Sequence, residues 1–496
     1  MFFILSVFRT KIKRKHTNVF DESEKRVYNG RNELQPRGGN GMKNRRSREI
    51  DMTNGSLVGK VLLFSLPLMG SGILQLLYNA ADIVVVGRYC GNASLAAVGS
   101  TGSLVNMIIN VFLGLSVGAG VTVANRIGAG DRAGVHRTVH TAVAMSVVSG
   151  LICGAIGVVF SRTFLIWMGT PGDVLNLSSL YLKIYFAGMP AIMLYNFGSA
   201  ILRAMGDTLR PLYFLTVSGL INVGLNLLFV CVFHLNVAGV ALATILSQIL
   251  SAALVLISLL RSDSVCRLFW RDIRIRKAEL LEIIRIGVPA GVQASMFSIS
   301  NVIIQSSINA YGSVVMAGNA ACSSLGGFPY TSMNAVHQAA VTFTSQNTGA
   351  KRFERINRVF GVTALTVTVI GLVMGGLTFL LRAPLLSLYS ADPAILPYGA
   401  LRMHFICLPY CLCGLQEVTA GMTRGMGQST VPMVVTIFGT CLLRVVWIAT
   451  VYRANPMLEM IYITYPLSWI VTGCAHLVCY RIVKKRLIRR MTASRP

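Results

Sequence analysis

The chain has 496 residues, of which 54% are hydrophobic and only 13% are charged, about half the charged fraction usual in soluble globular domains. A water-soluble enzyme is disfavoured, because a folded surface in water needs more charge than this, and the apolar content excludes disorder over most of the chain. The net charge of +27 would suit a nucleic-acid-binding protein, but its placement along the chain favours a membrane protein that binds no nucleic acid.

Residues 1–51 differ from the rest of the chain, with 13 basic and 6 acidic residues and little apolar periodicity. They are predicted to be a basic cytoplasmic tail that is disordered or precedes the natural start. Met1–Phe8 is too short to span a bilayer and follows no charged region, so it makes a poor signal peptide. We favour a translation start at Met42 or Met52, because the first apolar stretch follows soon after.

A helix that crosses a bilayer needs about 20 mostly apolar residues. Interruptions by Gly, Pro, Asn or Gln are tolerated where neighbouring helices satisfy the backbone. The sequence therefore predicts an all-α membrane protein with twelve transmembrane helices, at 61–88, 97–125, 138–160, 178–202, 211–233, 238–260, 286–310, 314–345, 360–381, 396–421, 431–452 and 458–481.

The basic residues test this count independently, because cytoplasmic loops are rich in Lys and Arg. When the loops are numbered alternately, those on one side carry 24 Lys and Arg, among them Arg203 and Arg424, whereas those on the other carry only four. The alternation indicates a multi-pass protein of the cell (inner) membrane with both termini in the cytoplasm, where basic loops contact anionic lipids.

The two halves of the chain repeat at a separation of about 221 residues. Pro67 matches Pro289, Gly128 matches Gly349, and Arg203-Ala-Met-Gly matches Arg424-Gly-Met-Gly. Six spans return the chain to its starting side, so the halves share one orientation and form two pseudo-symmetric lobes with the substrate between them. The predicted domains are an N-lobe at 52–262, a cytoplasmic linker at 263–283, a C-lobe at 284–482 and a basic cytoplasmic tail at 483–496.

Ionisable residues inside a bilayer are rare and by default functional. The clear case in the first half is Asp82, and oxygen-bearing side chains at a similar depth, about 10 Å below the outer surface, belong to Asn226 and Thr244. Asn222 lies one turn from Asn226. A carboxylate with neutral oxygens predicts a coupling site for Na⁺, or for H⁺ if burial makes Asp82 a proton carrier. Each amide or hydroxyl alone is more often a helix–helix hydrogen-bonding group.

The second half has no matching carboxylate. Glu417 and Arg444 are its deep charges, and a pairing between them is one interpretation. His337 and His404 are interpreted as hydrogen-bonded helix residues rather than ligands. The candidates for the substrate cavity are six polar residues of the spans: Gln75, Asn79, Asn301, Gln305, Glu417 and Arg444.

Several motifs together resemble the multidrug and toxic compound extrusion (MATE) transporters. They are the run from Pro67 to Asp82, Arg203-Ala-Met-Gly-Asp207, and Asn222-Val-Gly-Leu-Asn226, and the resemblance covers residues 52–482. It implies two six-helix lobes that export cationic or amphipathic compounds in exchange for Na⁺ or H⁺, with Asp82, Asn222, Asn226 and Thr244 at the family's first-lobe cation site. The chain departs from one branch of the family in the second half, where Phe297 and Ser298 occupy the region of a glutamate.

The sequence thus predicts a secondary active antiporter, not an enzyme, that works by alternating access. It predicts no cofactor besides the coupling ion, and a monomer whose partners are small-molecule substrates and membrane lipids. No P-loop motif is present, so the work comes from substrate flow or an ion gradient. The alternative is a lipid-linked saccharide flippase of a related fold, which favours a large cationic groove, whereas the predicted groove residues are mostly neutral amides.

Overall fold

The computed structural model describes residues 49–389 and 392–493, and this part of the chain consists of helices joined by short loops. The predicted tail at 1–51 lies almost wholly outside the described residues. The first lobe contains α2 (Leu57–Tyr89), α3 (Gly91–Gly128), α4 (Arg132–Trp167), α5 (Gly172–Ala187), α6 (Met189–Ala204), α7 (Leu209–Leu227) continued by the π-helix η2 (Leu228–Val232), and α8 (Asn236–Leu260).

A short 3₁₀ turn, η3 (Trp270–Asp272), leads to the second lobe. Its helices are α9 (Lys277–Asn309), α10 (Ser313–Gly349), α11 (Phe353–Leu380), α12 (Arg382–Ser387), α13 (Leu396–Cys407), α14 (Tyr410–Gly425), α15 (Thr430–Thr436), η4 (Ile437–Leu442), α16 (Leu443–Trp447), η5 (Ile448–Tyr452) and α17 (Leu458–Ala493). The helix α8 begins and ends close to its predicted span limits of 238 and 260, whereas α9 ends close to its predicted limit of 310 but begins before the predicted start at 286.

All twelve predicted spans fall on helices. Within the described residues, nine single helices and two bent pairs are long and apolar enough to cross a membrane. The twelfth span is α10, which has 37 residues but carries many Asn, Gln, Ser and Thr side chains. The prediction of an all-α protein with two six-helix lobes is confirmed.

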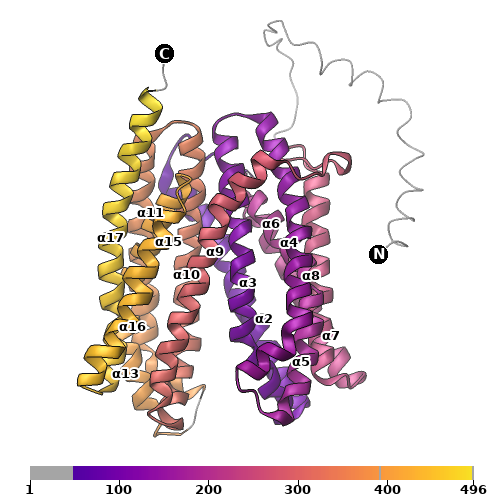
Figure 1. Cartoon of the computed structure of the whole chain (residues 1–496), viewed down its shortest axis with the longest axis vertical. Coiled ribbons are helices and arrows are strands. Elements are labelled where there is room, and N and C mark those ends of the chain that lie inside the picture. Colours follow the sequence, from indigo (N-terminus) through magenta and orange to yellow (C-terminus); the bar gives the residue numbers. More distant parts are fainter. Residues whose placement is uncertain (1–48, 390–391, 494–496) are drawn as a thin grey trace, which may run out of the picture. The chain divides into compact units, whose positions relative to one another are not determined.

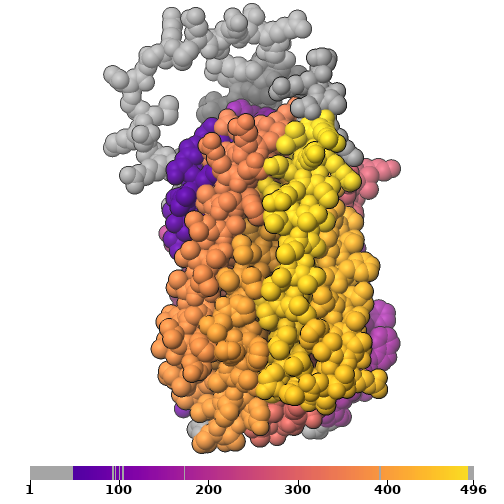
Figure 2. Space-filling view, turned by 90° about the vertical axis from the view of Figure 1, so that its left-hand side faces the viewer, coloured from indigo at the N-terminus to yellow at the C-terminus, as the bar shows by residue number. Residues whose placement is uncertain are grey.

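Two bundles stand side by side, one formed by α2 to α8 and one by α9 to α17 (Figure 1). We call the end at which α17 terminates the basic end. Outward-facing apolar side chains cover the bundles, for example Leu365 and Leu372 on α11 and Val478 on α17, all more than half exposed, and Figure 2 shows the face on which α17 is exposed in yellow. Such a surface suits contact with lipid rather than water.

Repeat-related bends occur in both lobes. The pair α5 and α6 is bent by 48° and the pair α13 and α14 by 44°. Gly188 and Pro190 lie at the first bend, and Pro409 lies at the second. A proline removes a backbone donor and clashes with the preceding turn, which breaks the helix. The bends redirect α6 and α14, which both contribute to the cavity described below.

Helices extend beyond two of the predicted domain boundaries. The segment 263–283, expected to be a linker, ends in helix because α9 begins at Lys277, and α17 runs to Ala493 through most of the expected tail at 483–496. Lys and Arg are good helix formers, so basic segments continue the helices past the apolar spans.

The residues before α2 pack on the second lobe. Met52 is completely buried, and its carbonyl oxygen accepts hydrogen bonds from Asn347 Nδ2 at 3.1 Å and from Arg355 Nε at 3.2 Å. Asn54 accepts from Arg352 Nη1 at 2.6 Å. Met52 and Asn54 are therefore anchored to the second lobe.

Glycines let the lobes approach closely at the basic end. A Cβ atom on Gly128 of α3 would lie 1.9 Å from the carbonyl oxygen of Gln346, and one on Gly349 of α10 would lie 1.9 Å from that of Asn125. Small residues allow such close helix packing in membranes. The Gln346 side chain adds a hydrogen bond to Ala204 O at 2.7 Å. The two lobes are thus closed against each other at this end.

Candidate functional site

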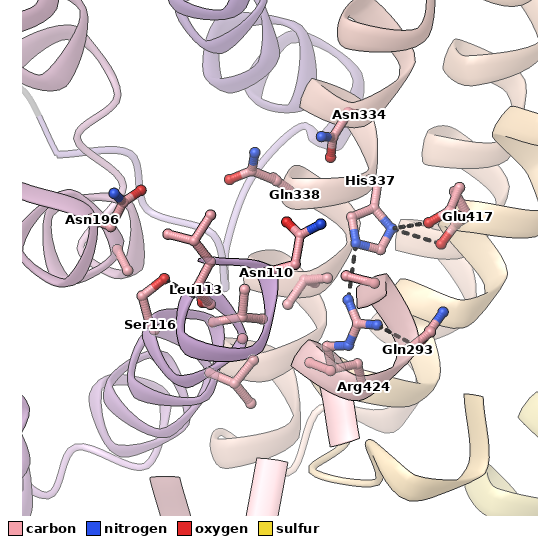
Figure 3. A pocket seen from close by; sticks show the side chains of 18 of the residues that line it. Asn110, Leu113, Ser116, Asn196, Gln293, Asn334, His337, Gln338, Glu417 and Arg424 are labelled. Atoms are coloured by element: carbon pink, nitrogen blue, oxygen red, sulfur yellow. Dashed lines mark hydrogen bonds and ion pairs between the residues drawn. The ribbon is translucent and has the colours of Figure 1, made fainter. Parts of the chain in front are cut away.

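A cavity of about 520 Å³ lies between the lobes and is lined by α3 and α6 of the first lobe and by α9, α10 and α14 of the second. Figure 3 shows part of its lining. The volume is in the range of small-molecule sites, and the position between two lobes is where paired-repeat transporters place substrate.

The walls of the cavity are built on the internal repeat. Residues of α3 and α10 at the 221-residue separation line it in matching pairs: Leu113 and Asn334, Ser116 and His337, Val117 and Gln338, Gly120 and Val341, and Val121 and Thr342. The side from α3 is mainly apolar, whereas the side from α10 is mainly polar. A cavity with one apolar and one polar wall fits an amphipathic molecule.

The bent helices contribute a second pair of matching residues. Asn196 and Arg203 of α6 correspond to Glu417 and Arg424 of α14, and all four line the cavity. Within each helix the two residues are seven apart, so they lie on one face. Each lobe therefore presents an arginine to the cavity at an equivalent place.

Hydrogen bonds fix the C-lobe arginine among its neighbours (Figure 3). Arg424 Nη2 donates to Gln293 Oε1 at 2.8 Å, and Nη1 lies 3.3 Å from His337 Nε2. A guanidinium only donates, so His337 Nε2 accepts and His337 Nδ1 carries the proton that is donated to Glu417 O at 2.7 Å. The histidine is therefore a neutral connector between Glu417 and Arg424.

A separate polar cluster lies inside the first lobe. Asn226 Nδ2 of α7 donates to Asp82 Oδ1 of α2 at 2.5 Å and to Asn222 Oδ1 at 3.3 Å. Asn226 is completely buried and Asn222 is 5% exposed. The structure thus brings together Asp82, Asn222 and Asn226, three of the four residues predicted for the coupling site.

Oxygen atoms near Asp82 are available to a cation. Asn226 Oδ1 is buried and accepts no hydrogen bond from the described residues. The side chains of Tyr181 and Tyr185 on α5, which the sequence analysis did not single out, lie close enough to Asp82 to interact with it electrostatically. Thr244, the fourth predicted residue, donates instead to Val240 O of its own helix at 3.0 Å. A carboxylate with neutral oxygens is the donor set that suits Na⁺ or a proton.

Of the six residues predicted for the substrate cavity, only Glu417 lines it. Gln75 and Asn79 are exposed on α2 outside the lining, because α9 rather than α2 forms that wall. Gln305 hydrogen-bonds to Asn319 and Asn309 at 2.7 and 2.9 Å. These placements show that polar character alone does not identify the helix face that meets the cavity.

Arg444 is also away from the cavity and does not pair with Glu417. It is 1% exposed, and its Nε donates to Ser468 Oγ at 3.0 Å and its Nη1 to Asn301 Oδ1 at 3.2 Å. Its guanidinium carbon lies 4.4 Å from the centre of the Tyr465 ring, a cation–π distance. Glu417 lies instead beside His337, with 3.9 Å between Oε2 and Nδ1. His337 is thus hydrogen-bonded, as the sequence predicts, but it also lines the cavity.

Sequence reasoning placed Arg203 and Arg424 among the loop charges, whereas the structure places both on helices facing the cavity. The repeated Arg-Ala/Gly-Met-Gly motif carried the signal, since a charge kept at one place in both halves indicates a shared position. Gln293, Asn110 and Asn196 were missed because isolated amides in apolar helices carry no spacing signal.

One group of metal-ligand types among the described residues comprises His136, His140 and Asp272 near the basic end. His140 Nε2 accepts from Phe269 N at 2.9 Å, and its Nδ1 lies 2.6 Å from His136 O. Both ring nitrogens of His140 are therefore occupied by backbone bonds, and the cluster joins the linker to α4.

Comparison with known proteins decides the family. The family model described as MatE matches residues 67–228 and 289–450, one match in each lobe. The chain belongs to the MatE family of multidrug efflux transporters. It is therefore a multi-pass membrane transporter and not an enzyme. The two matches coincide with the two halves of the internal repeat, which confirms the duplication found in the sequence.

Similar proteins include the probable multidrug resistance protein YoeA of Bacillus subtilis, which is 29% identical over 443 residues that cover 86% of this chain and 95% of that protein. The probable multidrug resistance protein NorM of Thermotoga maritima is 23% identical, with 83% and 88% covered.

Among solved structures, an outward-facing multidrug resistance MATE family transporter has a TM-score of 0.80 at 22% identity, with 88% of this chain and 98% of that chain covered. A MOP superfamily transporter from Pyrococcus furiosus, whose binding pocket is described as having reverse polarity, has a TM-score of 0.83 at 22% identity, with 90% and 99% covered. At these identities the likeness establishes the fold.

Proposed function

We propose that this MatE-family transporter is a secondary antiporter that exports cationic or amphipathic compounds through the inter-lobe cavity in exchange for Na⁺ or H⁺. The observation that carries the proposal is the pair of separate sites: a cavity between the lobes and a buried carboxyl cluster inside one lobe. Separate sites allow the ion and the substrate to bind to different groups of the same carrier, so this arrangement supports antiport.

The ion site in the proposal is Asp82 with Asn222 and Asn226. The Asn226 amide already donates to Asp82 Oδ1, which supports the charged carboxylate until the ion arrives. One carboxylate limits the site to about one positive charge, worth roughly 2.3 kcal/mol per 100 mV of membrane potential.

The substrate site in the proposal is the cavity lined by α3, α6, α9, α10 and α14. The mainly apolar α3 wall and the polar α10 wall support an amphipathic substrate, and the Glu417 carboxyl group offers a place for a positive charge. With the basic end in the cytoplasm, the closed contacts of Gly128 and Gly349 correspond to an outward-open state. Rocking of the lobes then separates these contacts and admits substrate from inside.

Vesicles that contain the purified protein and a fluorescent amphipathic cation test this proposal when the sodium gradient and the pH gradient are imposed separately. Efflux driven by one of the two gradients is the expected result, and it identifies the coupling ion. Dye movement that is equally fast with no gradient would show a passive pathway and contradict the antiport proposal.

A lipid-linked saccharide flippase gains one supporting observation. The sequence disfavoured a flippase because the predicted groove residues were mostly neutral amides. The cavity of the structure, however, is lined by two arginines, Arg203 and Arg424. Flipping of a fluorescent lipid with an anionic headgroup, without any dye efflux, would favour this second function.

A further inference from the structure

We propose that the inter-lobe cavity binds an anionic group of its substrate, a carboxylate or a phosphate, between Arg203 of α6 and Arg424 of α14. The inference rests on the proposed function, since it assigns substrate chemistry to the same cavity. It narrows the substrates from cationic or amphipathic compounds to amphiphiles that carry a negative group.

Arg424 has unused donors in a buried position. Its side chain is 7% exposed, two of its nitrogens contact Gln293 and His337, and its Nε has no hydrogen-bond partner among the described residues. No described carboxylate lies within 4.0 Å of its guanidinium. A buried charge is costly unless it is paired, so this group is ready to accept an anion.

Arg203 provides the second half of the site. It occupies the repeat-related place in the last turn of α6, lines the same cavity, and likewise forms no ion pair with a described carboxylate. The cavity therefore contains two guanidinium groups and one carboxyl group, that of Glu417. Arginine binds carboxylates and phosphates with two parallel hydrogen bonds, which makes a pair of arginines selective for such groups.

A purely structural role is the alternative for both arginines. Basic residues in the last turn of a helix stabilise its carbonyl ends, and both lie in a last turn. The hydrogen bonds of Arg424, however, go to side chains of α9 and α10 that line the cavity rather than to the carbonyls of α14. Helix capping explains where this arginine lies in the sequence but not where its side chain points.

The opposite wall defines the rest of the substrate. Leu113, Val117 and Val121 of α3 form an apolar surface in the same cavity. A molecule with an apolar ring system and one acidic group covers both features, because the rings bury apolar area against α3 while the acid reaches the arginines.

Two forms of one dye test the proposal: a rhodamine with a free carboxylate and its methyl ester. Each is loaded into vesicles with the purified protein, and efflux is driven by the coupling gradient. We expect the wild type to export the acid at a higher rate than the ester, and Arg203→Gln with Arg424→Gln to lower export of the acid by about tenfold. Export of the ester should change little.

Matched variants separate binding from folding. Arg203→Lys with Arg424→Lys keeps the charge and should retain part of the acid export, and Arg162→Gln removes an exposed arginine of α4 and should behave as wild type. If the wild type exports only the ester, or if the glutamine variant exports the acid normally, the inference is overturned. If the wild type exports neither dye under any gradient, the proposed antiport function itself fails.

The source of the anion is resolved by a third probe, a fluorescent phosphatidylglycerol in the vesicle membrane. Flipping that depends on both arginines would assign the anionic group to a lipid headgroup, whereas arginine-dependent export of the acid dye alone would assign it to a soluble amphiphile. Flipping and acid export that are both unaffected by the glutamine variant would refute the arginine site.

Discussion

The two lobes share one helical plan but place opposite charges at the contacts between equivalent pairs of helices. In the first lobe, Asp82 of α2 accepts a hydrogen bond from Asn226 of α7. In the second lobe, the corresponding helices bring Asn301 of α9 against Arg444 of α16. The Arg444 guanidinium is a fixed cation that contacts the oxygens of Asn301 and Ser468 and the ring of Tyr465. It therefore occupies a position in the second lobe comparable to the one proposed for a mobile cation in the first. From this comparison we assign the proposed ion site to the first lobe.

Opposite charges also occupy the repeat-related turns at the basic end, before α4 in the first lobe and before α11 in the second. Asp131 precedes α4, and its Oδ1 accepts from Gly134 N at 2.8 Å. The repeat-related residue before α11 is Arg352, which forms no cap and instead donates to Thr53 O at 2.6 Å. Duplication thus preserved the backbone of the turn while the side chains diverged.

Replacing Asp82 by Asn should abolish gradient-driven efflux while leaving folding intact, because the only carboxylate of the first-lobe cluster is lost. Dye accumulation in cells that express the variant measures this, and Asn79→Ala on the exposed face of the same helix is the control. Normal efflux by the Asp82 variant would remove the basis for an asymmetric ion site.

Replacing Gly128 by Ala should lower efflux by at least about fivefold, because a Cβ atom there meets backbone at 1.9 Å and keeps the lobes apart at the basic end. Gly349→Ala should have the same effect, since closure uses both lobes equally. Gly224→Ala, where a Cβ atom meets nothing within 4 Å, is the matched control. Unequal effects at the two glycines would contradict the symmetric closure.

Replacing Asn226 by Ala should reduce efflux by a few-fold rather than abolish it. The variant removes one hydrogen bond to Asp82, worth about 1 kcal/mol net, or roughly fivefold in affinity, but it keeps the carboxylate. The apparent affinity for the coupling ion, measured from the dependence of efflux on ion concentration, should weaken. A maximal rate that falls at unchanged ion affinity would place Asn226 outside the ion site.

Replacing Arg444 by Ala should lower stability by about 2–4 kcal/mol without changing the ion dependence. The large buried side chain leaves a void, and Asn301 and Ser468 each lose a partner. Thermal unfolding in detergent measures the first effect, and efflux at varied ion concentration measures the second. An altered ion dependence would show that the second lobe takes part in coupling.

Replacing Asp131 by Ala should cost less than about 1 kcal/mol, because the cap is partly exposed to solvent. The Gly134 N–H, followed by the Arg126 guanidinium, holds the pKa of Asp131 below its usual value. A lowered pKa contributes stability that is present above about pH 4 and is lost as the pH falls through the folded-state pKa. Wild type and variant should therefore converge in thermal stability at low pH, whereas a constant difference would rule out the capping charge.

The spans and the repeat were predictable because they depend on apolar length and on matching residues, which the sequence displays directly. The Asp82 cluster was predictable because a carboxylate in an apolar helix is conspicuous. The cavity was not predictable, because the sequence does not show which helices form its walls or which face of each helix turns inward. One wall is formed by α9 rather than α2. Arg203 and Arg424 were assigned to loops because they lie in the last turns of α6 and α14. Their place in the cavity lining became evident only from the structure, in which α6 and α14 are bent relative to α5 and α13.

The asymmetry of the lobes is tested most directly by comparing two kinds of transport in vesicles that contain Asp82→Asn. Dye-for-dye exchange without a gradient needs only the cavity and the rocking of the lobes, whereas gradient-driven efflux also needs the ion. We expect the variant to retain exchange and to lose gradient-driven efflux. Retention of gradient-driven efflux would show that the ion binds elsewhere and would contradict an ion site at Asp82.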